Sequence, residues 1–118
     1  MRGSKFLLPL APLIVAAAPA EDPNLADAEC LVVLGQLGAS EDAATRNAGM
    51  IGAQYYLGRL DGRAPAGDLR ALLKRAAETL KPADLQPILT RCGTVLQQRG
   101  QALQAIGQAL AKEAPAAK

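Results

Sequence analysis

The stretch LQPILTRCGTVLQQRGQALQAIGQALAK, residues 85–112, decides the fold. At about 100° per residue, its large apolar side chains fall in one arc about 120° wide. That arc holds Leu85, Ile88, Leu89, Cys92, Val95, Leu96, Leu103, Ile106 and Leu110. Asp84 can cap the start, and Pro87 fits only in a first helical turn. The pattern predicts a long amphipathic helix over residues 84–112.

Glycines mark one edge of this predicted helix. Gly93, Gly100 and Gly107 recur every seven residues, and Gln97 and Gln104 lie in the next arc outward with Gln101 and Gln108. Each glycine costs about 0.8–1 kcal/mol relative to alanine inside a helix, so three at this spacing require an explanation. We expect close packing against another helix of the same bundle. The alternative is a groove or self-association seam, in which glycine supplies space and glutamine supplies hydrogen bonds.

Arg99 falls inside the apolar arc of the same helix. Its aliphatic stem can lie on apolar surface while the guanidinium reaches solvent. The alternative is a bound anion or a paired carboxylate, for which Glu29 is a candidate. A buried arginine without such a partner would be unfavourable.

Three further helices are predicted before residue 84. Asn24 can cap a helix over residues 24–38, whose apolar face includes Cys30 and which ends at Gly38. Ser40 can cap a helix over residues 41–60, ended by Asp61-Gly62. Residues 64–67 read as a linker, and a third helix spans residues 68–81, from Asp68 to the break at Pro82. No strand alternation is present, so we predict an all-α four-helix bundle.

The helix over residues 41–60 is apolar on two sides. One face holds Ala44, Ala48, Ile51 and Tyr55, and the other holds Met50, Ala53, Tyr56, Leu57 and Leu60. Such a helix is either central in its bundle or presents an apolar face to a partner. Tyr55 and Tyr56 are about 100° apart, so one can be core while the other anchors a rim or an interface.

Arg59 and Arg63 follow the two tyrosines and lie one turn apart if that helix persists. Cations are favoured at helix carboxyl ends, so paired or solvated arginines are the ordinary interpretation. Asp61 and Asp68 are candidate partners, and a bound anion is the alternative.

The amino terminus reads as a secretory signal. Arg2 and Lys5 precede the apolar run of residues 6–18, and Ala18-Pro19-Ala20 supplies the small residues of a cleavage site. A membrane anchor needs about 20 apolar residues, and this run is shorter and is broken by prolines. We expect residues 1–20 to be removed after Ala20, leaving one domain over residues 21–112 and a disordered tail over residues 113–118. The protein is then periplasmic or secreted.

Export places Cys30 and Cys92 in oxidising surroundings, where two thiols tend to pair. We therefore predict one disulfide, which ties the first helix to the fourth. A catalytic thiol would need a base or a cationic pocket, and the chain contains no His.

The composition argues against several functional classes. Of 13 basic residues two lie in the signal, so the remaining 11 balance the 11 acidic residues. We expect no nucleic-acid partner, because a neutral chain lacks the electrostatic footprint for one. Two cysteines and no His disfavour a zinc or iron–sulfur site, and no phosphate-binding glycine loop is present, so we expect neither metal nor cofactor.

With Cys30 and Cys92 joining early and late helices over residues 24–112, the chain resembles acid-stress periplasmic chaperones of the HdeA type. It also resembles small helical immunity proteins that neutralise exported toxins. These resemblances are architectural, and no family site carries over to a residue of this chain. One departure concerns the chaperones: without His, only carboxylates can titrate as the pH falls.

Three functional hypotheses follow. The first is a non-catalytic module that binds a protein, or itself, through the glycine and glutamine edge or the second apolar face of residues 41–60. The second is a periplasmic stress chaperone, and a toxin-neutralising immunity protein is related to the first. The third is a small enzyme, which the missing His and the absence of a catalytic motif disfavour.

Overall fold

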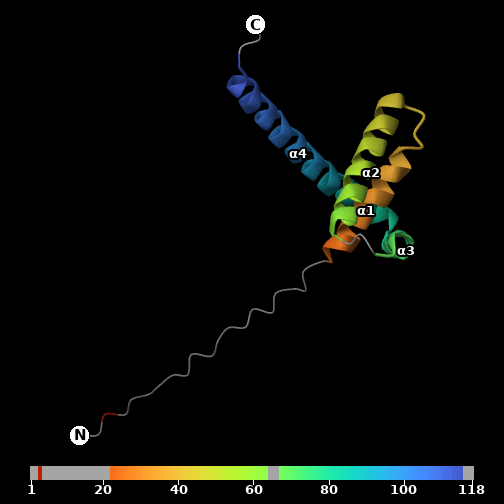
Figure 1. Cartoon of the computed structure of the whole chain (residues 1–118). Helices are drawn as coiled ribbons and strands as arrows, with labels where there is room; N and C mark the ends of the chain where they lie inside the picture. The colour runs from red at the N-terminus through yellow and green to blue at the C-terminus, as the bar shows by residue number, and fades with distance from the viewer. Residues whose placement is uncertain (1–2, 4–21, 64–66, 116–118) are drawn as a thin grey trace.

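The computed structural model describes Gly3, residues 22–63 and residues 67–115. Four α-helices and one 3-10 turn follow each other along the chain, and the described residues contain no strand. They are α1 (Pro23–Leu37), α2 (Ala43–Arg63), α3 (Leu69–Thr79), η1 (Pro82–Asp84) and α4 (Leu85–Glu113). The predicted all-α fold with four helices is confirmed (Figure 1). Apart from Gly3, the predicted signal peptide lies outside the described residues, as do most of the linker and residues 116–118.

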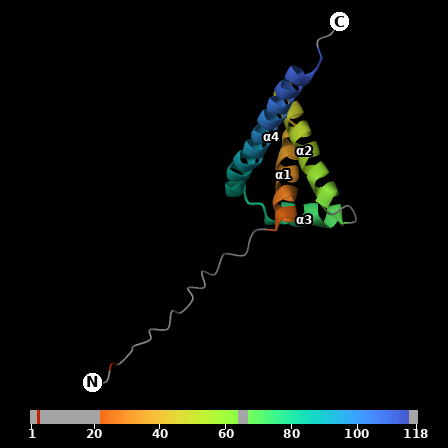
Figure 2. The same ribbon diagram turned by 60° about the vertical axis from the view of Figure 1, so that its left-hand side comes forward.

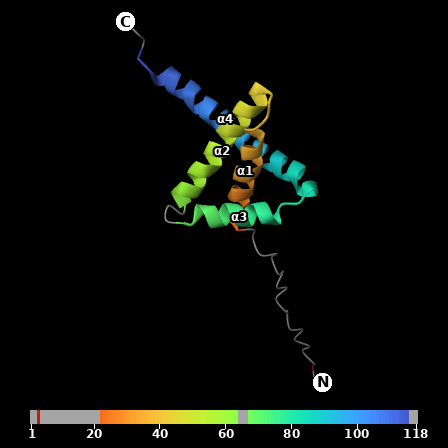
Figure 3. The ribbon, with the colours of Figure 1, turned by 90° about the vertical axis from the view of Figure 1, so that its right-hand side faces the viewer.

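Helix α1 is the centre of the fold, and each of the other helices packs against it. Helix α2 packs alongside it, α4 crosses it at a steep angle, and α3 crosses beneath α1 and α2 (Figures 1, 2 and 3). Its Cys30 and Leu34 form one buried cluster with Tyr56 and Cys92. Its Ala28 forms another with Leu60 of α2 and Ala76 of α3. One expectation for the helix over residues 41–60 was a central position in the bundle. In the structure, α1 occupies that position instead.

The first two helices begin differently from the prediction. Asp22, not Asn24, caps α1: its Oδ1 accepts a hydrogen bond from the Asn24 N–H at 3.0 Å, and Pro23 follows in the first turn. Asp42, not Ser40, caps α2, because its Oδ2 accepts from the Thr45 N–H at 2.9 Å. In both cases an aspartate two residues from the expected cap has the better reach to the free N–H groups.

The later helices are closer to the prediction. Asp68 caps α3 by accepting from the Ala71 N–H at 3.0 Å. Asp84 precedes α4 but does not cap it, because its carboxylate accepts instead from the Lys81 N–H at 3.1 Å, within the η1 turn. Helix α2 continues through Asp61-Gly62 to Arg63, three residues beyond its expected end. The intact helix keeps Arg59 and Arg63 on successive turns.

Two glycines let α2 approach α1 and α4 closely. A Cβ at Gly49 would lie 2.7 Å from the Leu34 carbonyl oxygen and 2.7 Å from the Leu37 Cβ. A Cβ at Gly52 would lie 2.9 Å from methyl groups of both Leu34 and Leu96. Small residues at these positions allow a short distance between the helix axes.

Beyond Leu96, α4 leaves the bundle. Figures 1 and 3 show its carboxyl half diverging from α1 and α2, and Figure 2 shows that end projecting past them. We call residues 97–113 the α4 arm; at 1.5 Å per residue it is about 25 Å long. No described helix is both long and apolar enough for a membrane crossing.

Candidate functional site

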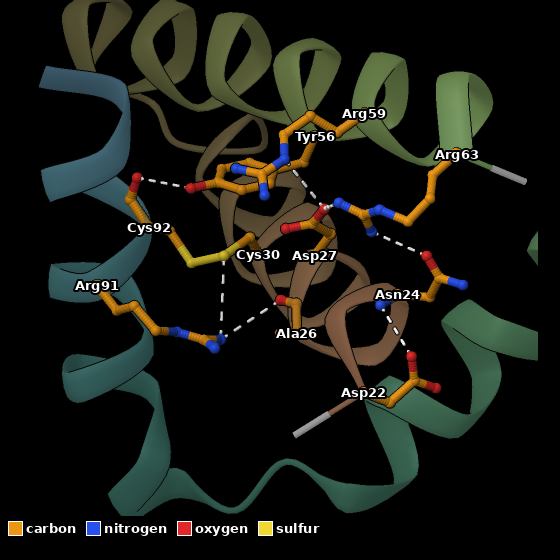
Figure 4. A network of polar contacts seen from close by, with 10 residues as sticks. All are labelled: Asp22, Asn24, Ala26, Asp27, Cys30, Tyr56, Arg59, Arg63, Arg91 and Cys92. Atoms are coloured by element: carbon orange, nitrogen blue, oxygen red, sulfur yellow. Dashed lines mark hydrogen bonds and ion pairs between the residues drawn. A yellow bond between two sulfur atoms is a disulfide. The ribbon is translucent and has the colours of Figure 1, made fainter. Parts of the chain in front are cut away.

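Cys30 of α1 and Cys92 of α4 form the predicted disulfide, with their Cα atoms 5.7 Å apart. Both residues are buried, Cys92 completely. Figure 4 shows the bond at the centre of a polar network that joins three helices. The disulfide therefore fixes the amino half of α4 against α1, and neither sulfur is a free thiol.

An ion pair flanks the disulfide. Arg91 and Glu29 each precede one of the bonded cysteines, and the Arg91 guanidinium lies 3.0 Å from the Glu29 carboxylate. Arg91 also donates to the Ala26 carbonyl oxygen at 3.4 Å. Glu29 is thus the partner of Arg91. The alternative that it pairs with Arg99 is wrong, because Arg99 lies about two turns along α4 from the disulfide.

A second group of charges joins α1 to α2. Asp27 is buried, with its side chain 7% exposed, and its Oδ2 lies 3.1 Å from Arg59 Nε and 2.8 Å from Arg63. Arg63 also donates to the Asn24 side-chain oxygen at 2.8 Å. The expectation of paired arginines is confirmed, but the carboxylate comes from Asp27 of α1 and not from Asp61 or Asp68. The two cations on successive turns of α2 converge on this one buried anion (Figure 4).

Tyr56 and Tyr55 complete the junction. The two rings meet edge to face with centroids 5.1 Å apart, and the Arg59 guanidinium lies 5.7 Å from the Tyr56 centroid. The Tyr56 hydroxyl donates to the Cys92 carbonyl oxygen at 2.9 Å. Burial raises the pKa of Tyr56 above its usual value, which keeps the hydroxyl neutral. Tyr56 is therefore the core tyrosine of the pair, and Tyr55 is half-buried at the rim.

The polar side chains of the network are engaged with one another. A pocket of about 200 Å³ opens beside the disulfide, and its polar lining includes Asp27, Tyr56, Arg59 and Arg91. Each of these side chains already holds a partner on another helix. Across the part of the chain that the structure describes, no group of three or more acidic or cysteine side chains is placed to hold a metal ion. The arrangement acts as a joint between helices.

The glycine edge of α4 has a different environment from the one expected. Among the residues that the structure describes, no atom lies within 4 Å of a Cβ placed at Gly93, Gly100 or Gly107, apart from the helix's own backbone. The expected close packing of another helix of the bundle across these glycines is therefore wrong. The glycines that do pack closely are Gly49 and Gly52 of α2. The open space leaves the second interpretation, a contact surface, as the one that still explains the glycines of α4.

The apolar face of the α4 arm is uncovered. Leu103 is 70% exposed, Ile106 55% and Leu110 59%. Gln97, Arg99 and Gln104 are exposed as well, and Arg99 makes no hydrogen bond or ion pair with any residue that the structure describes. Leu103, Ile106, Leu110 and Arg99 lie on the arc whose earlier members, such as Cys92, are in the core.

The face of α2 that holds Ala44, Ala48 and Ile51 is also exposed. Ile51 is 68% exposed, and Ala44 and Ala48 are exposed beside it. At about 100° per residue, Ala48 lies about 40° around the helix from Gly52, which contacts α4. This face therefore borders the point from which the arm diverges.

Comparisons of the chain with protein-family models, with curated proteins and with solved structures gave no match. The function must therefore be argued from the chemistry of these surfaces. Of the two candidate sites, the network at the disulfide has its charges paired, and the α4 arm has an apolar face without a partner within the described chain.

Proposed function

We propose that the protein is a non-catalytic protein-binding module, and that its contact surface is the apolar face of the α4 arm. The exposure of Leu103, Ile106 and Leu110 on one side of a projecting helix is the observation that carries this proposal. Single exposed hydrophobic residues are common on soluble proteins, but an aligned row of large ones marks an interaction surface.

The energetics of the arm support a binding role. Full burial of a leucine or isoleucine side chain contributes about 1.5–3 kcal/mol, and more than half of each of these three side chains is exposed. Glycine at positions 100 and 107 further weakens the helix, by about 0.8–1 kcal/mol each. A partner helix lying along the arm would bury the row. The open space above Gly93, Gly100 and Gly107 would admit its backbone, and Gln97 and Gln104 would supply hydrogen bonds at the edge.

We further propose that this module works in the periplasm or outside the cell. Residues 1–20 have the charge and apolar pattern of a cleavable signal, and the Cys30–Cys92 disulfide suits an oxidising compartment. A toxin-neutralising immunity protein would be one form of such a binding module, with the toxin as its partner.

Affinity capture with matched variants tests the proposal. The oxidised protein would serve as bait for an extract of its native compartment, beside Ile106→Glu and the control Gln101→Glu. Gln101 lies on the side of the arm opposite the apolar row, so both variants add the same charge to the same exposed helix. We expect a protein, the chain's own second copy included, to be retained by the wild type and by Gln101→Glu and lost with Ile106→Glu. Identical capture by all three baits would refute the proposal.

A periplasmic stress chaperone is the alternative, and apolar side chains exposed on two separate helices favour it. Ile51 of α2 is 68% exposed and Leu103 of the α4 arm is 70% exposed. Exposed apolar surface of this kind can hold an unfolded client. Suppression of client aggregation at low pH, compared with an inert protein of similar size, is the test, and absence of protection removes this alternative.

A further inference from the structure

The arm has a seven-residue repeat that suits pairing with another helix. Leu96, Leu103 and Leu110 recur at seven-residue intervals, and Arg99 and Ile106 lie three residues after the first two. This is the spacing of the two seam positions in a coiled coil. In the bundle, Leu96 is half-buried against α2, whereas the later members of the seam are exposed. The seam therefore continues about 25 Å beyond the point where the protein's own helices stop covering it.

The two edges of the seam carry small, uncharged residues. Gly100 and Gly107 lie on one side, with nothing within 4 Å of a Cβ placed at either. Ala102 and Ala109 lie on the other side. In ordinary coiled coils these edge positions hold charged side chains that choose the partner. Here they let another helix approach closely, so any charge selection must come from the seam itself.

The seam holds one cation and one anion, at opposite ends. Arg99, Lys112 and Glu113 are the charged residues of the arm. Lys112 faces away from the seam, by its place on the helix, whereas Arg99 lies in the seam and Glu113 follows Leu110 by three residues. The ion pairs that the structure shows include neither Arg99 nor Glu113. A fitting partner helix must offer an acid near Arg99 and a base near Glu113.

A second copy of the arm running in the opposite direction meets both requirements. Consider the register in which Leu103 lies opposite the partner's Ile106. In an antiparallel pair, moving four residues back along one helix means moving four residues forward along the other. Arg99 therefore lies opposite the partner's Leu110. Glu113 of the partner subunit then lies about 4.5 Å further along the axis, within reach of the long Arg99 side chain. The two-fold symmetry of such a pair forms this contact twice.

A parallel pair would bring the two copies of Arg99 side by side in the seam, and like charges so placed are unfavourable. We infer that the α4 arm pairs antiparallel with the α4 arm of a second copy, with Arg99 of each chain against Glu113 of the other. The inference rests on the proposed function, and it identifies the protein bound by the α4 arm as a second copy of the same chain. The arm projects away from α1, α2 and α3, which leaves its seam accessible to another molecule (Figures 1 and 3).

The size of the contact sets the expected affinity. Two arms about 25 Å long bury on the order of 1,000 Å² in total, which is the size of weak or transient complexes. We therefore expect a dimer with a dissociation constant on the order of 10 µM, and not a permanent assembly.

Sedimentation velocity tests the inference. The protein is expressed with its own amino-terminal sequence, purified oxidised, and diluted from about 500 µM to about 1 µM around the expected constant. We expect monomer at the low end and dimer at the high end. Arg99→Glu should weaken the dimer by about tenfold or more, since it sets a second acidic side chain against Glu113, and Arg99→Glu with Glu113→Arg should restore it to within about threefold. Gln101→Glu is the control and should change nothing.

Each other result has a definite meaning. If Arg99→Glu associates as strongly as the wild type or more strongly, the antiparallel register is overturned. In a parallel pair, residue 99 of one copy lies beside residue 99 of the other, so like charges meet both before and after the substitution. A wild type that stays monomeric at every concentration overturns the inference. If it still captures another protein in an Ile106-dependent way, the proposed function survives; if not, both fail. Far-UV circular dichroism confirms that each variant is folded, and Ile106→Glu disrupts the seam without altering the Arg99 contact.

Discussion

Alanine at two glycines of the same helix should change stability in opposite directions. Gly49 and Gly58 both lie within α2, so replacement by alanine brings the same gain in helix propensity, about 0.8–1 kcal/mol. Their surroundings differ. Nothing lies within 4 Å of a Cβ at Gly58, whereas a Cβ at Gly49 meets three atoms of α1 and the residue after it, all within 2.9 Å.

The magnitude at Gly49 follows from what those atoms are. The Leu34 carbonyl oxygen at 2.7 Å and the Gly38 nitrogen at 2.9 Å are backbone, so they cannot rotate away as a side chain can. Helices α1 and α2 must separate by about 0.7 Å to restore an ordinary contact, and overpacking of this kind costs about 1–3 kcal/mol. Taking the upper end for backbone atoms and subtracting the propensity gain, we expect Gly49→Ala to destabilise by about 2 kcal/mol. Gly58→Ala should stabilise by about 1 kcal/mol.

Urea denaturation of the oxidised proteins, followed by far-UV circular dichroism, measures both free energies of unfolding. The predicted difference between the variants is about 3 kcal/mol, well above the error of comparing midpoints with equal slopes. If Gly49→Ala were as stable as the wild type, the close approach of α1 and α2 would be wrong. If Gly58→Ala were destabilising instead, its open surroundings would be wrong.

Three further outcomes are expected. Asp27→Ala should destabilise by about 2 kcal/mol in urea, because it leaves Arg59 and Arg63 without their anion while their partial exposure lets solvent compensate in part; a change below about 0.5 kcal/mol would contradict the buried joint. Burial raises the pKa of Tyr56, so the stability that its neutral form contributes is complete below the unfolded pKa of about 10 and is lost as the pH rises through the folded pKa. Tyr56→Phe should therefore reduce the loss of unfolding free energy at alkaline pH. A pH profile equal to that of the wild type would contradict this role of Tyr56. Replacing Cys30 and Cys92 by alanine should lower the free energy of unfolding by about 4 kcal/mol, given the sequence separation of 62 residues, and a loss below about 1 kcal/mol would show that the cross-link constrains little.

Much of the fold could be predicted from apolar spacing. Residues 85–112 show one clean apolar arc, and the predicted bounds of all four helices lie within about three residues of those observed. The caps were harder, because Asp22 and Asp42 stand next to other polar residues that can also accept a hydrogen bond. The centre of the fold was missed, since α1 is apolar on nearly every side and no single face of it stands out.

The joints between helices were only partly predictable. Two cysteines leave one possible pairing, so the disulfide could be predicted once export was expected. The disulfide also brings the residues that precede the two cysteines close together. Glu29 and Arg91 have opposite charges, so their ion pair could have been predicted from the sequence. The pairing of Asp27 with Arg59 and Arg63 depends on how α1 rotates against α2, which residue spacing alone does not encode. Asp27, one of two acids on a mostly apolar helix, was the available hint.

The two sets of glycines separate stability from association. At Gly49 and Gly52 the absent side chain lets helices of one chain touch, whereas at Gly100 and Gly107 it leaves space that no described residue fills. Alanine in the first set should therefore destabilise the fold in dilute protein. Alanine in the second set should bring only its gain in helix propensity there, and it should also alter concentration-dependent assembly. Because the two sets share no contacts, their effects should add when combined. Coupling between them would mean that the arm packs against its own bundle in solution, and the surface on which the proposed function rests would then be covered.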